Sequence, residues 1–252
     1  MKLPARIALL ASAIVIFAGA PASGAPDQSA PTPYPSRAED WPGVGVTRVF
    51  GWMKDNRAFF WSERDKRQNS IVFAGDSLTA NWKTLSADLR ADFKDTPVAN
   101  RGIGGDVSRG LLFRFDEDVL ALHPKAIVIL IGINDLTARQ PAQATLQNIR
   151  SMLEEKQAQQ ADVPVILCTV PPSANPKAPV DEQQRRLLND GLRKIASDTK
   201  HVSVVDLYAA TVTADGTPDI RYFNTDQLHL NAAGHARWRE LLTPALHAAG
   251  VP

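Results

Sequence analysis

Short runs of apolar residues alternate with longer amphipathic stretches along this chain, and this pattern predicts its secondary structure. The apolar runs are rich in Val, Ile and Leu and end at turn residues, as strands buried on both faces of a sheet do. The longer stretches repeat apolar residues at helical spacing, as Leu146, Ile149 and Leu153 do. The predicted strands cover residues 71–74, 97–100, 126–131, 163–170 and 202–205, and the predicted helices cover 47–67, 78–93, 107–122, 141–159, 181–199 and 232–248.

Strands that alternate with helices predict an α/β protein in which helices cover both faces of a parallel sheet. The expected fold class is therefore a three-layer α/β/α domain with a five-stranded parallel sheet. The pattern does not give the strand order, and the flavodoxin-like order 2-1-3-4-5 is the natural expectation for five strands. Residues 45–252 contain no internal repeat and do not change in composition along their length, so we interpret them as one domain.

For the first and third predicted helices, the sequence also predicts a core-facing side and an N-cap residue. In the first, Val49, Trp52, Phe59 and Phe60 are candidates for the face that packs on the core. In the third, Asp106 precedes the helical stretch and is a suitable N-cap, because its carboxylate can accept from free backbone N–H groups.

The N-terminal residues differ in composition from the predicted domain. Two basic residues precede an apolar stretch over residues 7–20, and small residues follow at 22–24. These are the parts of a secretory signal peptide over residues 1–24, so a secreted or periplasmic location is expected. The apolar stretch is shorter than the ~20 residues that a membrane-spanning helix needs. Residues 25–44 are rich in Pro and are interpreted as an extended, poorly ordered N-terminal extension.

Charge and cysteine content exclude some classes of function. The chain has 28 Lys and Arg against 27 Asp and Glu, a formal net charge of +1. Without a basic excess, binding to nucleic acid or to an anionic membrane surface is not expected. Cys168 is the only cysteine, which excludes an intrachain disulfide. Its apolar neighbours indicate a small buried side chain rather than a catalytic thiol.

Polar residues follow the predicted strands, at the edge of the sheet where α/β proteins bind ligands. Ser77 follows the first strand, Gly105 lies in a glycine-rich turn after the second, and Asn134 follows the third. Asp226 and His229 precede the last helix. These residue types suit acyl transfer: a serine nucleophile needs a histidine base, and the base needs a carboxylate that orients it. The oxyanion needs fixed donors, which a glycine-turn N–H, the Asn134 amide and the Ser77 N–H could supply.

The same segments resemble the motif blocks of the SGNH, or GDSL, hydrolases, a family of serine esterases and lipases. The resemblance covers roughly residues 70–245. The sequence at 75–78 looks like the block with the nucleophilic serine, and those at 100–106 and 132–135 look like the two blocks with oxyanion donors. The sequence at 226–229 looks like the block that holds acid and base.

This resemblance implies the SGNH hydrolase fold and a role for each matched residue. Ser77, Asp226 and His229 would form the catalytic triad. Ser77, Gly105 and Asn134 would form the oxyanion hole. The expected partner is a small-molecule, glycan or lipid ester, and no cofactor or metal is implied. The oligomeric state does not follow from the sequence.

Within the family, the motifs at 102–106, 123–125 and 228–231 are most similar to the platelet-activating-factor acetylhydrolase subgroup. That similarity implies short acyl groups, and the predicted function is a secreted serine esterase that acts through an acyl-enzyme on Ser77. Two alternatives stay open. One is a lipid hydrolase of the lysophospholipase or thioesterase type on the same triad. The other is a non-catalytic carbohydrate-binding module, which the five Trp residues could support.

Other motifs are weaker. The glycine-rich turn fails the dinucleotide pattern G-x-G-x-x-G, because Val107 stands at the last glycine position. A metal site from Asp226, His229 and His235 is disfavoured, because the spacing of the two histidines fits no helical ligand pair. Four further side chains are interpreted as lying outside the catalytic machinery. Asp76 is expected to brace the nucleophile turn, and Asp135 to be a loop or helix-cap residue. Arg101 and Arg109 are expected to be solvated rather than to contact an anionic substrate.

Overall fold

The computed structural model describes residues 29–94 and 96–252, so the predicted signal peptide lies outside the described residues. Five parallel strands form one sheet in the order β2-β1-β3-β4-β5, which confirms the predicted α/β fold and strand order. The strands are β1 Ile71–Gly75, β2 Val98–Gly102, β3 Ala126–Leu130, β4 Val165–Cys168 and β5 Val202–Val205.

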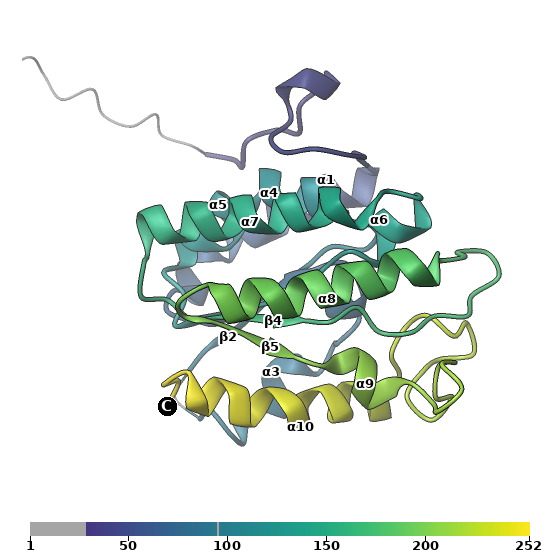
Figure 1. Cartoon of the computed structure of the whole chain (residues 1–252). Helices are drawn as coiled ribbons and strands as arrows, with labels where there is room; N and C mark the ends of the chain where they lie inside the picture. Colours follow the sequence, from purple (N-terminus) through teal and green to yellow (C-terminus); the bar gives the residue numbers. More distant parts are fainter. Residues whose placement is uncertain (1–28, 95) are drawn as a thin grey trace, which may run out of the picture.

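Helices cover both faces of the sheet, as Figure 1 shows. One layer contains α1 Gly51–Ser62, α4 Ser108–Phe113, α5 Phe115–Asp118, α7 Ala142–Gln159 and α8 Glu182–Asp198. On the other side lie α3 Leu85–Arg90 and α10 Ala232–Ala248. The short helices are α2 Ser77–Ala80, α6 Ile133–Thr137 and α9 Leu207–Thr211, with 3-10 turns η1 Ala38–Asp40, η2 Arg64–Arg67 and η3 Leu120–Leu122.

Two predicted helices are divided in the structure. The stretch 78–93 forms α2 and α3 with a turn between them, and the stretch 107–122 forms α4, α5 and η3. The prediction that Asp106 caps the third helix was wrong, because the N-cap position is occupied by Val107. The Asp106 carboxylate is buried: its Oδ1 accepts from the Val107 N–H at 3.0 Å, and its Oδ2 accepts from Arg114 Nε at 2.8 Å, a contact that sequence spacing alone does not reveal.

The predicted inward face of the first helix was also largely wrong. Helix α1 begins at Gly51 and buries Met53, Arg57 and Phe60, which follow one another at helical spacing. Trp52 and Phe59 lie on the exposed side, with 51% and 59% of their surface accessible. Only Phe60 of the four proposed residues therefore packs on the core.

The described part of the N-terminal extension, residues 29–44, packs on the domain instead of extending freely. Trp41 is buried and stacks on Tyr34 at a centroid distance of 5.5 Å. The Arg109 guanidinium donates to the carbonyl oxygens of Ala38, Trp41, Pro42 and Gly45 at 2.9–3.1 Å. The expectation of a solvated Arg109 is thus wrong, because this side chain donates to four backbone carbonyls of the N-terminal segment.

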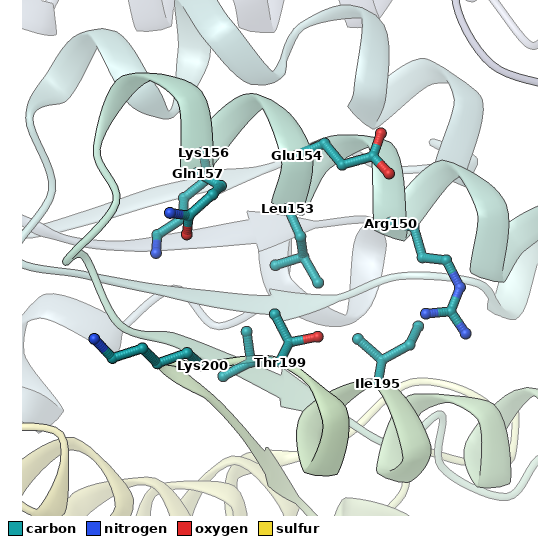
Figure 2. A pocket seen from close by; sticks show the side chains of 9 residues that line it. Arg150, Leu153, Glu154, Lys156, Gln157, Ile195, Thr199 and Lys200 are labelled. Atoms are coloured by element: carbon teal, nitrogen blue, oxygen red, sulfur yellow. The ribbon is translucent and has the colours of Figure 1, made fainter.

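A surface cavity of about 240 Å³ lies between α7 and α8, near the amino end of β5. Figure 2 shows Leu153 of α7 and Ile195 of α8 on its two sides, with the charged ends of Arg150, Lys156 and Lys200 around them. Because Val202 begins β5, this cavity is at the opposite end of the sheet from the carboxyl ends that carry Ser77 and Asn134. It is therefore separate from the site described below.

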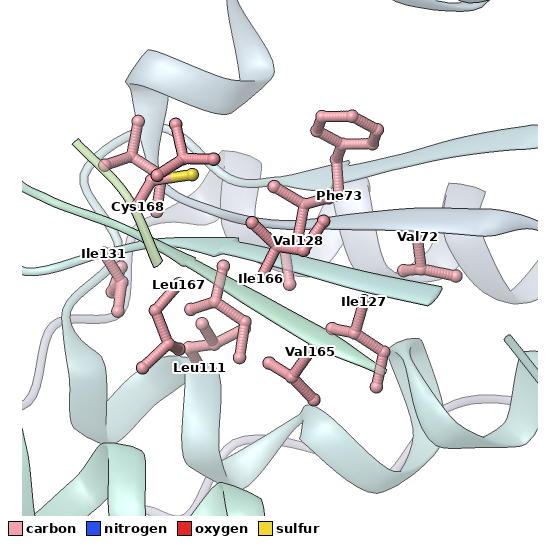
Figure 3. Packing of buried hydrophobic residues seen from close by; sticks show 14 of the residues in the cluster. Val72, Phe73, Leu111, Ile127, Val128, Ile131, Val165, Ile166, Leu167 and Cys168 are labelled. Carbon is pink, nitrogen blue, oxygen red and sulfur yellow. The ribbon is translucent and has the colours of Figure 1, made fainter. Parts of the chain in front are cut away.

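The core lies on both faces of the sheet (Figure 3). Phe73 and Cys168 point to one side, where Trp238 of α10 packs on Phe73 and donates its Nε1–H to Cys168 Sγ. Ile127 and Val165 point to the other side, where Leu111 of α4 lies. Burial raises the pKa of the Cys168 thiol to about 12, which agrees with the prediction of a packing residue.

Candidate active site

The predicted nucleophile, Ser77, is the first residue of α2 and is separated from the end of β1 by Asp76 alone. Gly75 closes the strand, and a Cβ at this position would lie 2.2 Å from the carbonyl oxygen of Leu130, so a larger residue does not fit. Asp76 is the N-cap of α2, and its Oδ1 accepts from the Leu78 N–H at 2.9 Å. This contact agrees with the interpretation of Asp76 as a brace, and it fixes the turn that presents Ser77.

His229 and Asp226 face Ser77 in a continuous hydrogen-bonded chain. His229 Nε2 lies 2.9 Å from Ser77 Oγ, and His229 Nδ1 lies 2.6 Å from Asp226 Oδ2. This geometry lets an imidazole accept the serine proton while the carboxylate stabilises the resulting cation. The structure thus brings Ser77 next to Asp226 and His229, which lie far from it in the sequence.

The turn that carries the acid and the base is fixed by its own backbone. Asp226 Oδ1 accepts from the N–H groups of Leu228 and His229, each at 3.0 Å. Gln227, which follows Asp226, has a φ of 51°, in the left-handed region, and its carbonyl accepts from the Ala174 N–H at 3.0 Å. Partial burial would raise the pKa of Asp226, but the hydrogen bonds from His229 and Leu228 outweigh it and lower the pKa, so the carboxylate stays charged.

The two predicted oxyanion donors outside the triad follow β2 and β3, the two strands that flank β1. Gly105 has a φ of 83°, which a residue with a side chain rarely adopts. A Cβ on Gly104 would lie 4.0 Å from the Ser77 Cβ, so the glycine turn passes close to the nucleophile. Asn134 lies near the start of α6, and its Nδ2 donates to the Asp106 carbonyl at 2.9 Å. A side-chain amide has two N–H groups, so one of them remains for a ligand.

The buried side chain of Arg114 joins these segments by hydrogen bonds. Arg114 donates from Nε to Asp106 Oδ2 at 2.8 Å, from Nη1 to Asp118 Oδ2 at 3.3 Å and from Nη2 to the Gly75 carbonyl at 3.1 Å. Burial raises the pKa of Asp106 to about 6, although the Arg114 charge opposes this shift. This network joins the end of β1, which precedes Ser77, to the residue that follows Gly105.

Asp135 and Arg101 differ from the sequence-based interpretation, because both are buried. Asp135 Oδ1 accepts from Ser108 Oγ at 2.5 Å and from Gln140 Nε2 at 2.8 Å, so it ties α6 to α4 rather than ending a helix. Arg101 packs its guanidinium over the Phe60 ring at 4.7 Å, and burial lowers its pKa to about 10. Because both side chains are buried, neither the Asp135 carboxylate nor the Arg101 guanidinium is exposed to contact a substrate.

Three residues before and within the start of α1 also reach the site, and the sequence pattern did not indicate them. Trp52 Nε1 donates to the Gly104 carbonyl at 2.9 Å. Phe50 stacks on Trp52 with ring centroids 4.5 Å apart and packs against Gly105. Arg48 Nη1 lies 3.4 Å from Asn134 Oδ1. Only the unusual density of large side chains in this segment could have drawn attention to it.

His235, the remaining candidate for a metal site, is a packing residue of α10. Its ring stacks on Trp82 at 5.1 Å with an interplanar angle of 9°. Within residues 29–94 and 96–252, no three His, Cys, Asp or Glu side chains are grouped as metal ligands would be. In the same part of the chain, no helix has the length and apolar composition required to cross a bilayer.

The family model of the GDSL-like lipase/acylhydrolases matches residues 73–237, a range that includes every predicted site residue. Esterase TesA of Pseudomonas aeruginosa is 32% identical over 118 residues, which is 43% of this chain and 58% of the esterase. The match therefore spans less than two thirds of the length of that relative.

Two solved structures share the fold over most of their length. One, from Bacteroides fragilis NCTC 9343 and assigned as an acylhydrolase, is 27% identical with a TM-score of 0.68 and covers 79% of this chain and 99% of its own. The other, from Streptococcus pneumonia and named for a platelet activating factor, is 21% identical with a TM-score of 0.63. It covers 77% of this chain and 94% of its own and shows a shared fold. Taken with the family match, these similarities confirm the resemblance found in the sequence: the chain belongs to the GDSL-like lipase/acylhydrolase family.

Proposed function

We propose that this protein is a serine esterase that hydrolyses carboxylic esters through an acyl-enzyme on Ser77. The observation that carries the proposal is the chain of contacts from Ser77 Oγ through His229 to Asp226, at 2.9 and 2.6 Å. Further support comes from membership of an acylhydrolase family and from the partial similarity to an esterase.

In the first half of the reaction, Ser77 Oγ forms a bond to the ester carbonyl carbon while its proton moves to His229 Nε2. The carbonyl oxygen becomes an oxyanion, which the N–H groups of Ser77 and Gly105 and the Asn134 amide would stabilise. The bond to the alcohol oxygen then breaks, and the alcohol leaves with the proton from His229. Asp226 holds the imidazole in position and stabilises its charged form.

In the second half, water attacks the acyl-enzyme carbonyl and gives a proton to His229. The bond between the acyl carbon and Ser77 Oγ breaks, and Ser77 recovers that proton. The carboxylic acid is released. Every proton in this cycle passes between Ser77, His229, the alcohol and water, so the scheme needs no further reactant.

Hydrolysis of p-nitrophenyl acetate by the purified protein tests the proposal. Ser77→Ala should abolish turnover above the uncatalysed rate, whereas Ser203→Ala, a change at an exposed serine of β5, should leave it unaltered. A serine-directed phosphonate should add its mass to the peptide that contains Ser77. Unchanged turnover in Ser77→Ala would refute the mechanism, and absence of turnover in the parent would favour the non-catalytic carbohydrate-binding alternative.

We further propose that the enzyme prefers short acyl groups, acetyl above all. This rests on the motif similarity to the acetylhydrolase subgroup and is open to a lipid-hydrolase alternative. A series of p-nitrophenyl esters from acetate to palmitate separates the two, because kcat/KM should fall as the chain lengthens. A rise toward long chains would favour a lysophospholipase or thioesterase type of substrate.

A secreted or periplasmic location is also a proposal, and it rests on the composition of residues 1–24. Mass spectrometry of the protein from its own cells tests it, because export by this route should yield a chain that begins near residue 25. A full-length chain in the cytoplasmic fraction would contradict the proposal.

A further inference from the structure

The side chain of Arg48 reaches the predicted oxyanion hole from a segment that the family's motif blocks do not include. Its Nη1 lies 3.4 Å from Asn134 Oδ1, and the side chain is partly buried. Among the described residues, Arg48 forms no salt bridge with a carboxylate. Its guanidinium instead donates to the amide oxygen of a predicted site residue, which links Arg48 to the site.

The backbone on both sides of Arg48 is fixed to the domain. Asn148 donates to the Val44 carbonyl and accepts from the Val44 N–H, both at 2.9 Å. The Val46 N–H donates to Gln140 Oε1 at 2.7 Å. On the other side, α1 begins at Gly51. Arg48 is therefore held between two anchored points, which limits the conformations that its guanidinium can adopt.

Asn134 connects this guanidinium to the place where the oxyanion would form. One N–H of its Nδ2 donates to the Asp106 carbonyl, which leaves the second N–H free for a ligand. A positive group that donates to the amide oxygen withdraws electron density from the amide and makes its N–H groups stronger donors. The same contact opposes rotation of the amide away from this orientation.

We propose that Arg48 is a positioning residue of the oxyanion hole, which orients and polarises the Asn134 amide so that its free N–H stabilises the tetrahedral oxyanion. This inference rests on the esterase function proposed above. The hydrogen bond from the Asn134 N–H to the substrate gains strength only as negative charge develops on the ester carbonyl oxygen. Loss of Arg48 should therefore lower kcat and change KM little.

A double-mutant cycle tests this role. Arg48→Gln should lower kcat for p-nitrophenyl acetate about tenfold, in the range expected for a charge-assisted hydrogen bond. In the Asn134→Ala background the same substitution should change kcat less than about twofold, because the group through which Arg48 acts is gone. Arg48→Lys should recover part of the loss. Arg37→Gln, which removes an exposed arginine from the same N-terminal segment, is the matched control and should have no effect.

A second readout does not depend on turnover. The side-chain amide resonance of Asn134, assigned by its loss in Asn134→Ala, should shift in Arg48→Gln and stay in place in Arg37→Gln. Equal losses of kcat in both backgrounds, or an unmoved resonance, would overturn the role proposed for Arg48. An increase in KM limited to anionic esters would overturn it too, because it would make Arg48 a substrate contact. If the parent does not hydrolyse esters, the esterase proposal fails, and the resonance still reports the contact.

Discussion

Arg114 and Asp106 form a fully buried ion pair directly beneath the candidate active site, with Arg114 Nε 2.8 Å from Asp106 Oδ2. The same guanidinium donates to the Gly75 carbonyl at the end of β1. One side chain therefore sets the distance between the nucleophile turn and the glycine turn.

Arg114→Met should destabilise the fold by about 3–5 kcal/mol, because it leaves the buried Asp106 carboxylate without its cation and Asp118 with Arg57 alone. Urea unfolding followed by circular dichroism measures this loss. Arg193→Met removes a partly exposed arginine that pairs with Asp206, and should change the free energy of unfolding by only ~0–1 kcal/mol. Equal losses in the two variants would show that the buried pair has no special role.

Asn134→Ala should lower kcat by about 10²–10³ while the protein stays folded, because it removes one of the proposed donors to the oxyanion. Steady-state kinetics with p-nitrophenyl acetate and a melting curve check the two halves of this expectation. A change in kcat within about twofold would remove Asn134 from the oxyanion hole. A large fall in melting temperature would instead point to loss of its bond to the Asp106 carbonyl.

Asp226→Asn should reduce kcat less than Ser77→Ala does, because in the proposed mechanism the carboxylate orients His229 and takes no part in bond formation. The geometry supports this order, since Asp226 Oδ2 contacts the imidazole at 2.6 Å while only His229 reaches Ser77. Both rates come from one assay with saturating substrate. Equal losses would mean that the carboxylate is as essential to the reaction as the nucleophile.

The fold and the positions of Ser77 and Asn134 could be predicted from the sequence for a simple physical reason, whereas Asp226 and His229 directly follow none of the strands and were predicted from their residue types and from the family resemblance. Strands buried on both faces must be continuously apolar, so β1, β3 and β4 stand out, and the polar residues that follow them must meet at one edge of a parallel sheet. Helix boundaries were less predictable. Asp106 has the residue type of an N-cap, but its ion pair with Arg114 depends on a tertiary contact.

The N-terminal segment could not be predicted, because its contacts join side chains to the backbone of residues far away in the sequence. Arg109 binds carbonyl groups of residues 38–45, and no periodicity or motif marks such an interaction. Trp52 likewise donates to the backbone of Gly104, and Arg48 donates to the distant side chain of Asn134. Their positions follow from how this segment is anchored, which only the folded chain reveals.

Trp52→Phe should lower kcat about twofold to tenfold, because it removes the indole N–H that fixes the Gly104 carbonyl and so loosens the turn that presents Gly105. Phe59→Ala is a suitable control, since this aromatic residue is also exposed on α1 but lies near the end of the helix, whereas Trp52 lies near its start. Kinetics on the short-chain ester measure both variants. A similar loss in Phe59→Ala would attribute the effect to helix α1 rather than to the hydrogen bond.

The pH dependence of stability should carry a contribution from Asp76. Burial raises the pKa of this carboxyl to about 8, opposed by the hydrogen bond from Leu78, so the folded state keeps a proton that the unfolded chain loses above its ordinary pKa of 3.8. The contribution is therefore fully present below pH 3.8 and is lost as the pH rises toward 8. Asp76→Asn removes this titration, and its amide can still accept from the Leu78 N–H.

The free energy of unfolding of Asp76→Asn, relative to the parent, should thus increase between pH 4 and pH 8 by on the order of a few kcal/mol. Urea titrations at several pH values measure that difference. Asp65→Asn, at a carboxylate that is 92% exposed, should give a difference that does not vary with pH. A flat profile for Asp76→Asn would mean that Asp76 is ionised in the folded protein, with the Arg114 charge and the Leu78 N–H sufficient to stabilise it.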